Sequence, residues 1–169
     1  DKADLGSAIH FYQQAIAKDD QFALAYVWLG TAYNDQTYWS DFFKDHFADT
    51  LKYFADKSLT LDPDLAEGYW LSGNYYFLQG DIENSILQFK KTINYNANLG
   101  EALRDLGKCY RIYEQYANAI MVDQKACQLK IGSPDYFVYL LELGGAYLSI
   151  GDFIKTDSMA LKGTDLNPI

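Results

Sequence analysis

The residue types that most often perform catalysis or bind metals are few in this sequence and form no recognisable set. The chain of 169 residues has two histidines, His10 and His46, and two cysteines, Cys109 and Cys127. Neither histidine has a second histidine or a cysteine at the spacing of a zinc site. The glycine-rich phosphate loops and the hydrolase motifs G-x-S-x-G and H-E-x-x-H are also absent. We therefore expect a protein that is not an enzyme and that needs no cofactor or metal.

Three cations indicate a different kind of chemistry, the binding of anions. Arg104, Lys108 and Arg111 follow i, i+4, i+7 spacing, which places them on one face of a helix. The chain has 14 Lys and Arg against 23 Asp and Glu, so a positive face would stand out and would attract an acidic segment, a carboxylate or a phosphate. The alternative interpretation is a solvated helix face on which Asp105 and Glu101 pair with the cations.

Composition restricts the partners that such a face could have. The net charge of −9 argues against general binding to nucleic acid or to anionic lipid. No apolar run approaches the length of a membrane span, and the polar first residues show no signal peptide. Two cysteines at dissimilar helix positions favour two buried thiols over a disulfide. We expect a cytoplasmic protein whose partner is a protein or peptide, with no membrane insertion.

The elements that position these residues are helices, and four glycines give their period. Each glycine precedes a tyrosine by three residues. The distance from one glycine to the next is 43, 34 and 37 residues along the chain. A small residue recurs later in each unit, where it is the first core-facing residue of a second helix. The four glycines are Gly30, Gly73, Gly107 and Gly144, and the small residues are Ala8, Ser85, Ala119 and Thr156.

The recurrence of glycine inside helices has a physical explanation in packing. Glycine costs up to about 1 kcal/mol against alanine in a helix. Four such residues in register are expected if a side chain of the neighbouring helix must lie against bare backbone. The pattern therefore predicts antiparallel helix hairpins that approach closely at each glycine.

In this register the chain resembles the tetratricopeptide repeat (TPR) family over nearly its whole length. The family pattern W-x2-L-G-x2-Y…A-x3-F…P is present in degenerate form, and Asp62-Pro63 and Asn167-Pro168 close two of the units. The resemblance implies an all-α fold, a right-handed superhelical solenoid of antiparallel helix hairpins with about nine helices. We expect one array with units 1–22, 23–65, 66–99, 100–136 and 137–169, of which the first is the second helix of a truncated repeat.

The resemblance also implies where a partner binds. In the TPR family the first helix of each hairpin lines a concave groove that holds a peptide or a partner helix. Val27 stands where some family members supply a lysine that clamps a peptide's terminal carboxylate, so the chain departs from that pattern. The groove residues carried over to this sequence are Thr31, Asn34, Glu67, Trp70, Asn74, Arg104, Lys108 and Arg111, and Val138, Leu141, Gly145 and Leu148 hold the same positions in the last hairpin.

One hairpin is longer than the others. Tyr33 and Leu51 are 18 residues apart, whereas Tyr76 and Ser85 are nine apart. Ser40 is a candidate N-cap, and the spacing predicts a long helix over 41–61. Within the insertion, Trp39, Phe42 and Phe43 form a candidate second interaction surface. The alternative is that they fold back over the helix at residues 4–18.

We consider three biological roles for the chain and expect the first of them. The first is a module that binds a peptide or partner protein in the groove. The second is a regulatory or sensory segment of a larger bacterial signalling protein, such as a transcription regulator or a nucleotide cyclase. The third is a scaffold that forms homo-oligomers through exposed repeat ends. The chain begins within a repeat and lacks a polar capping helix, so we expect a fragment of a longer protein.

Overall fold

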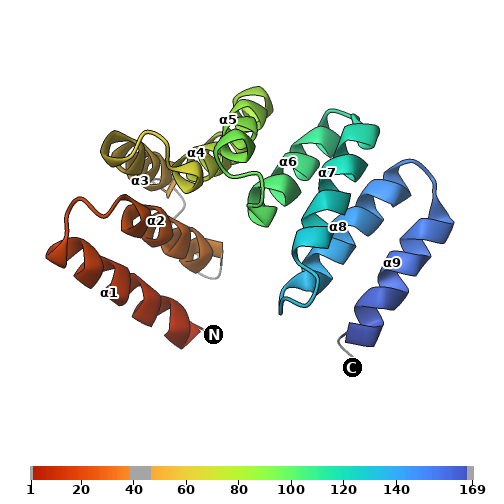
Figure 1. The fold of residues 1–169 in the computed structure, drawn as a ribbon, viewed down its shortest axis with the longest axis horizontal. Coiled ribbons are helices and arrows are strands. Elements are labelled where there is room, and N and C mark those ends of the chain that lie inside the picture. Colours follow the sequence, from red (N-terminus) through yellow and green to blue (C-terminus); the bar gives the residue numbers. More distant parts are fainter. Residues whose placement is uncertain (1, 39–46, 167–169) are drawn as a thin grey trace. The chain divides into compact units, whose positions relative to one another are not determined.

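The computed structural model describes residues 2–38 and 47–166, and every regular element in those ranges is a helix (Figure 1). The predicted N-cap Ser40, the start of the predicted helix at residue 41 and the candidate surface residues Trp39, Phe42 and Phe43 lie outside the described residues. The helices are α1 (Lys2–Lys18), α2 (Ala23–Tyr38), α3 (Phe47–Leu61), α4 (Ala66–Leu78), α5 (Ile82–Tyr95), α6 (Gly100–Ile112), α7 (Tyr116–Leu129), α8 (Tyr136–Ser149) and α9 (Phe153–Leu166).

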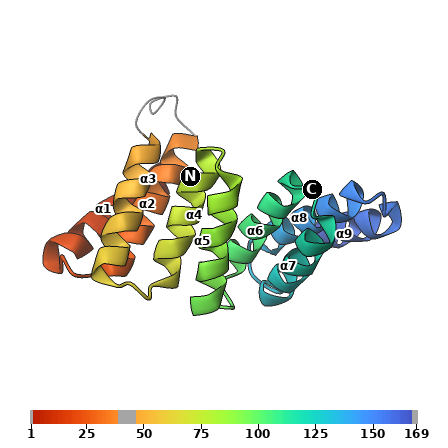
Figure 2. The ribbon, with the colours of Figure 1, turned by 90° about the horizontal axis from the view of Figure 1, so that it is seen from above.

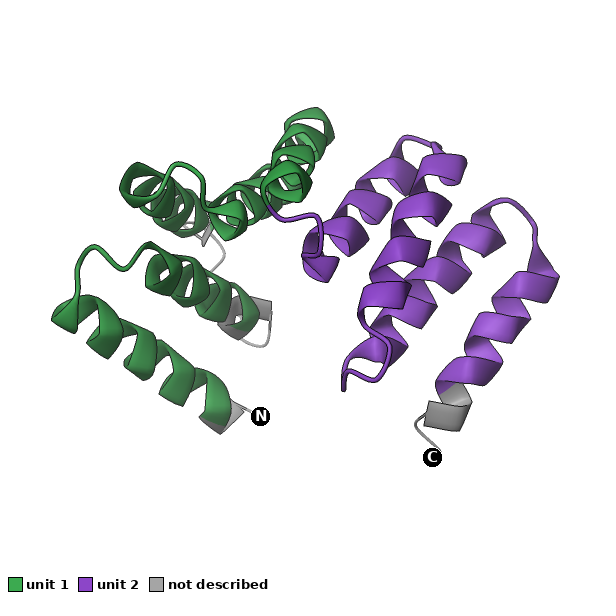
Figure 3. Ribbon diagram, viewed as in Figure 1, with its two compact units in different colours: residues 1–95 green, residues 96–169 purple. Residues whose placement is uncertain are grey.

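The helices divide into two compact units, residues 1–95 and residues 96–169 (Figure 3). Within each unit every helix packs on the next one in the chain, as Figure 2 shows for the hairpin α4–α5. In addition α2 contacts α4, and α6 contacts α8. The first helices of successive hairpins therefore lie together inside each unit, as the repeat pattern predicts.

The turns of the α4–α5 and α8–α9 hairpins each combine a left-handed glycine with an aspartate that caps the next helix. Gly80 and Gly151 have φ of +74° and +76°, a left-handed conformation that is easiest for glycine. The Asp81 carboxylate accepts the backbone N–H of Asn84 at 3.1 Å, and the Asp152 carboxylate accepts that of Lys155 at 3.1 Å. These capping bonds satisfy donors that a helix start leaves unpaired.

Three of the four register glycines lie against a neighbouring side chain, as their recurrence predicts. A Cβ at Gly73 would be 2.5 Å from the Phe89 ring, and one at Gly30 would be 3.0 Å from Leu71. A Cβ at Gly107 would overlap the Asp123 carboxylate. Gly144 differs, because a Cβ there would meet Met159 at 3.5 Å, which is ordinary van der Waals contact.

Each unit has its own core. The core of unit 1 is formed by Ile9, Tyr26, Val27, Leu29, Ala32, Leu51, Phe54, Ala55 and Leu71. In unit 2 both cysteines, Cys109 and Cys127, are buried free thiols, as expected from their positions. None of the helices in residues 2–38 and 47–166 combines the length and the apolar composition needed to cross a bilayer.

Candidate functional site

The candidate groove residues of unit 1 lie on α2 and α4, which are in contact. Trp70 is only 7% exposed, and its ring packs on Trp28 with 6.2 Å between the ring centroids. The hydroxyl of Thr31 donates to the backbone carbonyl of Val27 at 3.0 Å, and Val27 itself is fully buried. Trp70 therefore acts largely as a packing residue between the two helices.

The three remaining candidates of unit 1 are polar and half-buried. They are Asn34 on α2 and Glu67 and Asn74 on α4. These side chains retain accessible surface on α2 and α4, as does Thr31.

In unit 2 the cations Arg104 and Lys108 converge on one carboxylate. Arg104 Nε lies 3.2 Å from Asp105 Oδ1, and Lys108 Nζ lies 3.2 Å from the same atom. The Asp105 residue is only 6% exposed. Buried carboxylates are stable when cations and hydrogen bonds compensate them, so these two cations have a structural role in α6.

The third cation, Arg111, links α6 to the next two helices. Its Nη1 donates to Asp123 Oδ2 of α7 at 2.6 Å, and its Nη2 donates to Glu142 Oε2 of α8. Lys108 Nζ lies 3.4 Å from the other oxygen of Glu142. Spacing predicted that the three cations share a face, and the structure brings them together around Asp105, Asp123 and Glu142. We call these six residues the charged cluster.

Asp123 and Glu142 are members of the cluster that the sequence reasoning missed. A signal for Asp123 exists in the repeat register, because it follows Ala119 by four residues as Phe89 follows Ser85. Phe89 is fully buried against Gly73, and Asp123 is 1% exposed against Gly107. A carboxylate at the aromatic position of a repeat therefore predicts a buried charge that needs a cationic partner.

Burial sets the protonation of the cluster. Desolvation raises the pKa of Asp123 to about 7, with Glu142 acting in the same direction and Arg111 opposing both. When Asp123 is ionised, three cations face three carboxylates and the charges balance. When Asp123 is protonated, the cluster carries one net positive charge. The face is therefore less positive than the three cations alone would make it.

A second group of charges surrounds Tyr139 at the start of α8. Two cations lie over its ring, Arg104 with Cζ 5.5 Å from the centroid and Lys130 with Nζ 5.4 Å from it. Lys130 Nζ lies 2.5 Å from Glu101 Oε1. The alternative interpretation expected Glu101 to pair with the three cations of α6, but Glu101 pairs with Lys130 instead. The Tyr139 hydroxyl is buried without a hydrogen-bond partner among the described residues, and burial raises its pKa to about 12.

An apolar stripe runs along α8 beside the cluster residue Glu142. Val138, Leu141 and Leu148 are 39%, 53% and 53% exposed, and Gly145 between them leaves the backbone uncovered. These four residues, which we call the α8 stripe, hold the groove positions that the family resemblance assigned to the last hairpin. Exposed leucines next to a charge network can bury the apolar side of a partner segment and orient its charges.

The fold can now be compared with known proteins. No protein-family model and no curated protein matches the sequence, but solved structures match almost all of it. MamA is 21% identical, with 98% of this chain and 90% of MamA covered at a TM-score of 0.66. The thermophilic TPR protein TTC0263 of Thermus thermophilus is 15% identical, with 97% and 84% covered at a TM-score of 0.77.

A third similar structure is a chain of the APC/C hetero-tetramer Cut9–Hcn1. It is 15% identical, with 98% of this chain and 31% of that chain covered at a TM-score of 0.80. At these identities the likeness concerns the fold. The chain is an all-α helical repeat protein with a TPR-like fold, and this fold is in general a scaffold for protein–protein interaction.

Proposed function

We propose that the chain is a non-catalytic interaction module that binds a peptide or partner protein on the α6–α8 face of unit 2. The observation that carries this proposal is the α8 stripe, whose exposed leucines lie on the same helix as Glu142 of the charged cluster. Such a surface fits a segment with apolar side chains and an acidic group. The half-buried Asn34, Glu67 and Asn74 are the corresponding candidates in unit 1.

The charged cluster supports an acidic contact mainly through Lys108. Its side chain is 34% exposed, compared with 23% for Arg104 and 18% for Arg111. Lys108 also makes the longest ion-pair contact of the cluster, at 3.4 Å to Glu142, and its contact with Asp105 at 3.2 Å is as long as that of Arg104. An incoming carboxylate could therefore share Lys108 while the two arginines keep their structural pairs.

The known structures of this fold support a protein partner. The Cut9–Hcn1 structure is described as a hetero-tetramer, so that TPR-like chain assembles with another protein. The net charge of −9 of the present chain favours a partner whose acidic group is confined to the contact with Lys108. A partner that is acidic over its whole length would be repelled.

The test is a selection of phage-displayed random peptides on the immobilised chain. We expect enriched peptides to combine Leu, Ile or Phe with Asp or Glu. The affinity of a selected peptide should fall at least about tenfold in Leu141→Lys, because a charge replaces apolar contact area. In Lys108→Gln the affinity should fall less and should lose much of its salt dependence.

The matched control is Lys125→Gln, which removes an exposed lysine of α7 that belongs neither to the charged cluster nor to the α8 stripe. It should bind the selected peptides as the unaltered chain does. The proposal fails if Leu141→Lys and the unaltered chain enrich the same peptides with equal affinity.

A second candidate function, self-association, is favoured by α9. Phe153, Ile154 and Leu161 of this helix are 64%, 84% and 66% exposed, and exposed apolar patches of this kind often mark interfaces. A concentration series in light scattering should then show a mass that rises with concentration, and Ile154→Glu should abolish the rise. A constant monomer mass in the unaltered chain would eliminate this candidate.

A further inference from the structure

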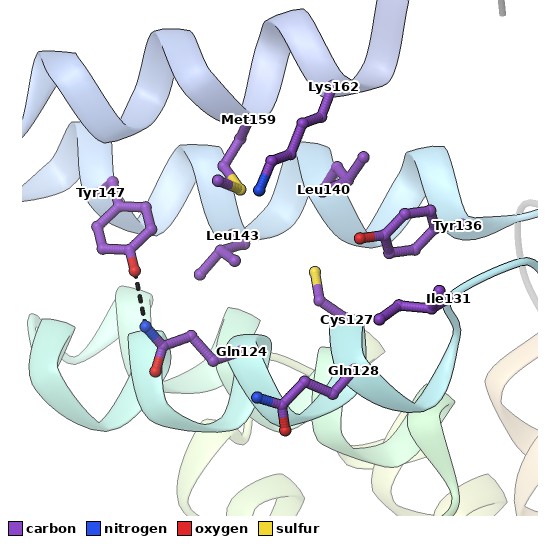
Figure 4. A pocket seen from close by; sticks show the side chains of 10 residues that line it. All are labelled: Gln124, Cys127, Gln128, Ile131, Tyr136, Leu140, Leu143, Tyr147, Met159 and Lys162. Atoms are coloured by element: carbon purple, nitrogen blue, oxygen red, sulfur yellow. Dashed lines mark hydrogen bonds between the residues drawn. The ribbon is translucent and has the colours of Figure 1, made fainter. Parts of the chain in front are cut away.

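Unit 2 contains a cavity that the proposed binding face does not use. Its volume is about 330 Å³, and it lies among α7, α8 and α9 (Figure 4). This size falls at the lower end of the roughly 300–1,000 Å³ typical of sites for small molecules. The cavity could therefore hold a compact ligand.

The cavity exists because of how three helices pack. α7 and α9 each pack on α8, but the two do not contact each other within the described residues. The floor between them is a face of α8 that carries Tyr136, Leu140, Leu143 and Tyr147, spaced so that they lie on one side of the helix. At one end Gln124 of α7 donates a hydrogen bond to the Tyr147 hydroxyl at 2.7 Å.

This face is distinct from the α8 stripe. Val138, Leu141 and Leu148 of the stripe do not line the cavity, whereas Leu140 and Leu143 do. Glu142, which neighbours Leu141 of the stripe in the sequence, pairs with Arg111 of α6, whereas the residues that line the cavity belong to α7, α8, α9 and the α7–α8 connection. A ligand in the cavity would thus bind independently of the proposed partner surface.

The lining of the cavity combines an apolar floor with one cation. Leu140 and Leu143 are buried and form apolar floor. Lys162 and Met159 reach into the cavity from α9, with the Lys162 amine beside the Met159 side chain (Figure 4). Among the described residues that line the cavity, none is acidic.

The thiol of the cavity adds no opposing charge. Cys127 Sγ donates to the Tyr139 carbonyl at 3.1 Å, and burial raises the pKa of this thiol to about 11. It is therefore neutral near pH 7, and Lys162 is the one formal charge among the lining side chains. Although the chain carries a net charge of −9, the lining of the cavity is locally positive, and it therefore favours an anionic ligand.

We propose that the cavity binds a small monocarboxylate with an aliphatic body. The carboxylate pairs with Lys162 Nζ, and the aliphatic body packs on Leu140, Leu143 and Met159. A single cation suits a single negative charge, since a phosphate dianion would call for further cations. The side-chain amide of Gln128, which also lines the cavity, can donate a hydrogen bond to the ligand.

The two methionines of the chain allow a direct test. Met159 lines the cavity, whereas Met121 is 62% exposed and does not. In a chain labelled with ¹³C at the methionine methyl groups, octanoate should shift the Met159 signal saturably and leave the Met121 signal in place. The variant Met159→Leu assigns the two signals.

The class of ligand is tested with 1-octanol and with a lysine variant. Lys162→Gln should weaken octanoate binding about tenfold or more, because a charge-assisted contact is lost, while its melting temperature stays unchanged. 1-Octanol should bind more weakly than octanoate and should not respond to Lys162→Gln. Lys125→Gln, an exposed lysine on α7 outside the cavity, should leave the octanoate affinity unchanged.

Three results would overturn the proposal. The first is the absence of a saturable octanoate shift at Met159. The second is an equal shift at Met121 and Met159, which would indicate unspecific adsorption. The third is an octanoate affinity that is the same in Lys162→Gln, which would remove the carboxylate from the ligand class.

Discussion

Arg111 Nη1 lies 2.6 Å from Oδ2 of Asp123, whose residue is 1% exposed. The pair joins the two helices of the α6–α7 hairpin at the position where the preceding hairpin packs Phe89 on Gly73. One repeat thus uses an ion pair where its neighbour uses an aromatic ring. A buried ion pair is costly to break, although an apolar replacement can be as stable.

The first prediction follows from this use of an ion pair in place of an aromatic ring. Arg111→Leu should lower the free energy of unfolding by about 3 kcal/mol at pH 8, because it leaves a buried carboxylate uncompensated. The double variant Arg111→Leu/Asp123→Phe should recover most of the loss, since it restores the ring that Phe89 provides in the other repeat. Urea unfolding measures both values. An Arg111→Leu variant as stable as the unaltered chain would show that the pair contributes nothing.

The second prediction concerns pH. The pKa of Asp123 is about 7 in the folded chain, against an ordinary value of 3.8. Between these values the folded chain binds a proton at Asp123 that the unfolded chain has lost. The contribution of Asp123 to stability is therefore fully present below about pH 4 and is lost as the pH rises through 7. The slope from one such proton is at most about 1.4 kcal/mol per pH unit.

Asp123→Asn provides the comparison for this pH dependence. Urea unfolding between pH 5 and 7.5 should show a steeper loss of stability in the unaltered chain than in Asp123→Asn. The pKa values of Asp81, Asp135 and Asp152 are lowered, so their contributions are lost as the pH falls below the ordinary value. They do not mask this window. Identical slopes in both proteins would mean that Asp123 is ionised throughout.

Local periodicity was sufficient to predict the helices. The range 66–99 contains α4 and α5 with the left-handed Gly80, whereas α8 begins at Tyr136, one residue before the range 137–169 that contains α9 and the left-handed Gly151. The agreement is this close because turns and helix faces depend on neighbouring residues. The predicted face of three cations is also a property of one helix. These features required no knowledge of contacts between distant parts of the chain.

The counter-charges of that face could not be predicted in the same way. Asp123 is 12 residues from Arg111 and Glu142 is 31 residues from it, so both reach it only through hairpin packing. The cavity around Lys162 likewise depends on α7 and α9 flanking α8. Spacing gives the face of a helix but does not say which side chain of another helix meets it.

The third prediction uses two glycines of unit 2 as a matched pair. Gly107→Ala should destabilise the chain by about 1–3 kcal/mol, because the new methyl group overlaps an Asp123 carboxylate that Arg111 holds in place. Gly145→Ala should be neutral or stabilising by up to about 1 kcal/mol, because a Cβ there meets nothing within 4 Å. Thermal unfolding measures both. Equal effects of the two substitutions would show that the close approach at Gly107 is incorrect.

The fourth prediction concerns the turn between α6 and α7. Glu114 has φ of +58° and stands where the other two hairpins of this length place Gly80 and Gly151, with φ of +74° and +76°. A residue with a Cβ is strained in this region by about 1–2 kcal/mol, while glycine adds about 0.4–1 kcal/mol of entropy to the unfolded chain. Glu114→Gly should therefore raise the free energy of unfolding by about 0.5–1 kcal/mol.

Glu114→Ala separates relief of backbone strain from loss of the glutamate side chain. Glu114 is exposed, so removing its side chain should change stability little, and the alanine Cβ retains the strain. We expect Glu114→Ala to be as stable as the unaltered chain and Glu114→Gly to be more stable, as measured by urea unfolding at one pH. If both variants gain equally, the gain comes from removing a negative charge in an acidic chain, and the strain assigned to the left-handed backbone at Glu114 is absent.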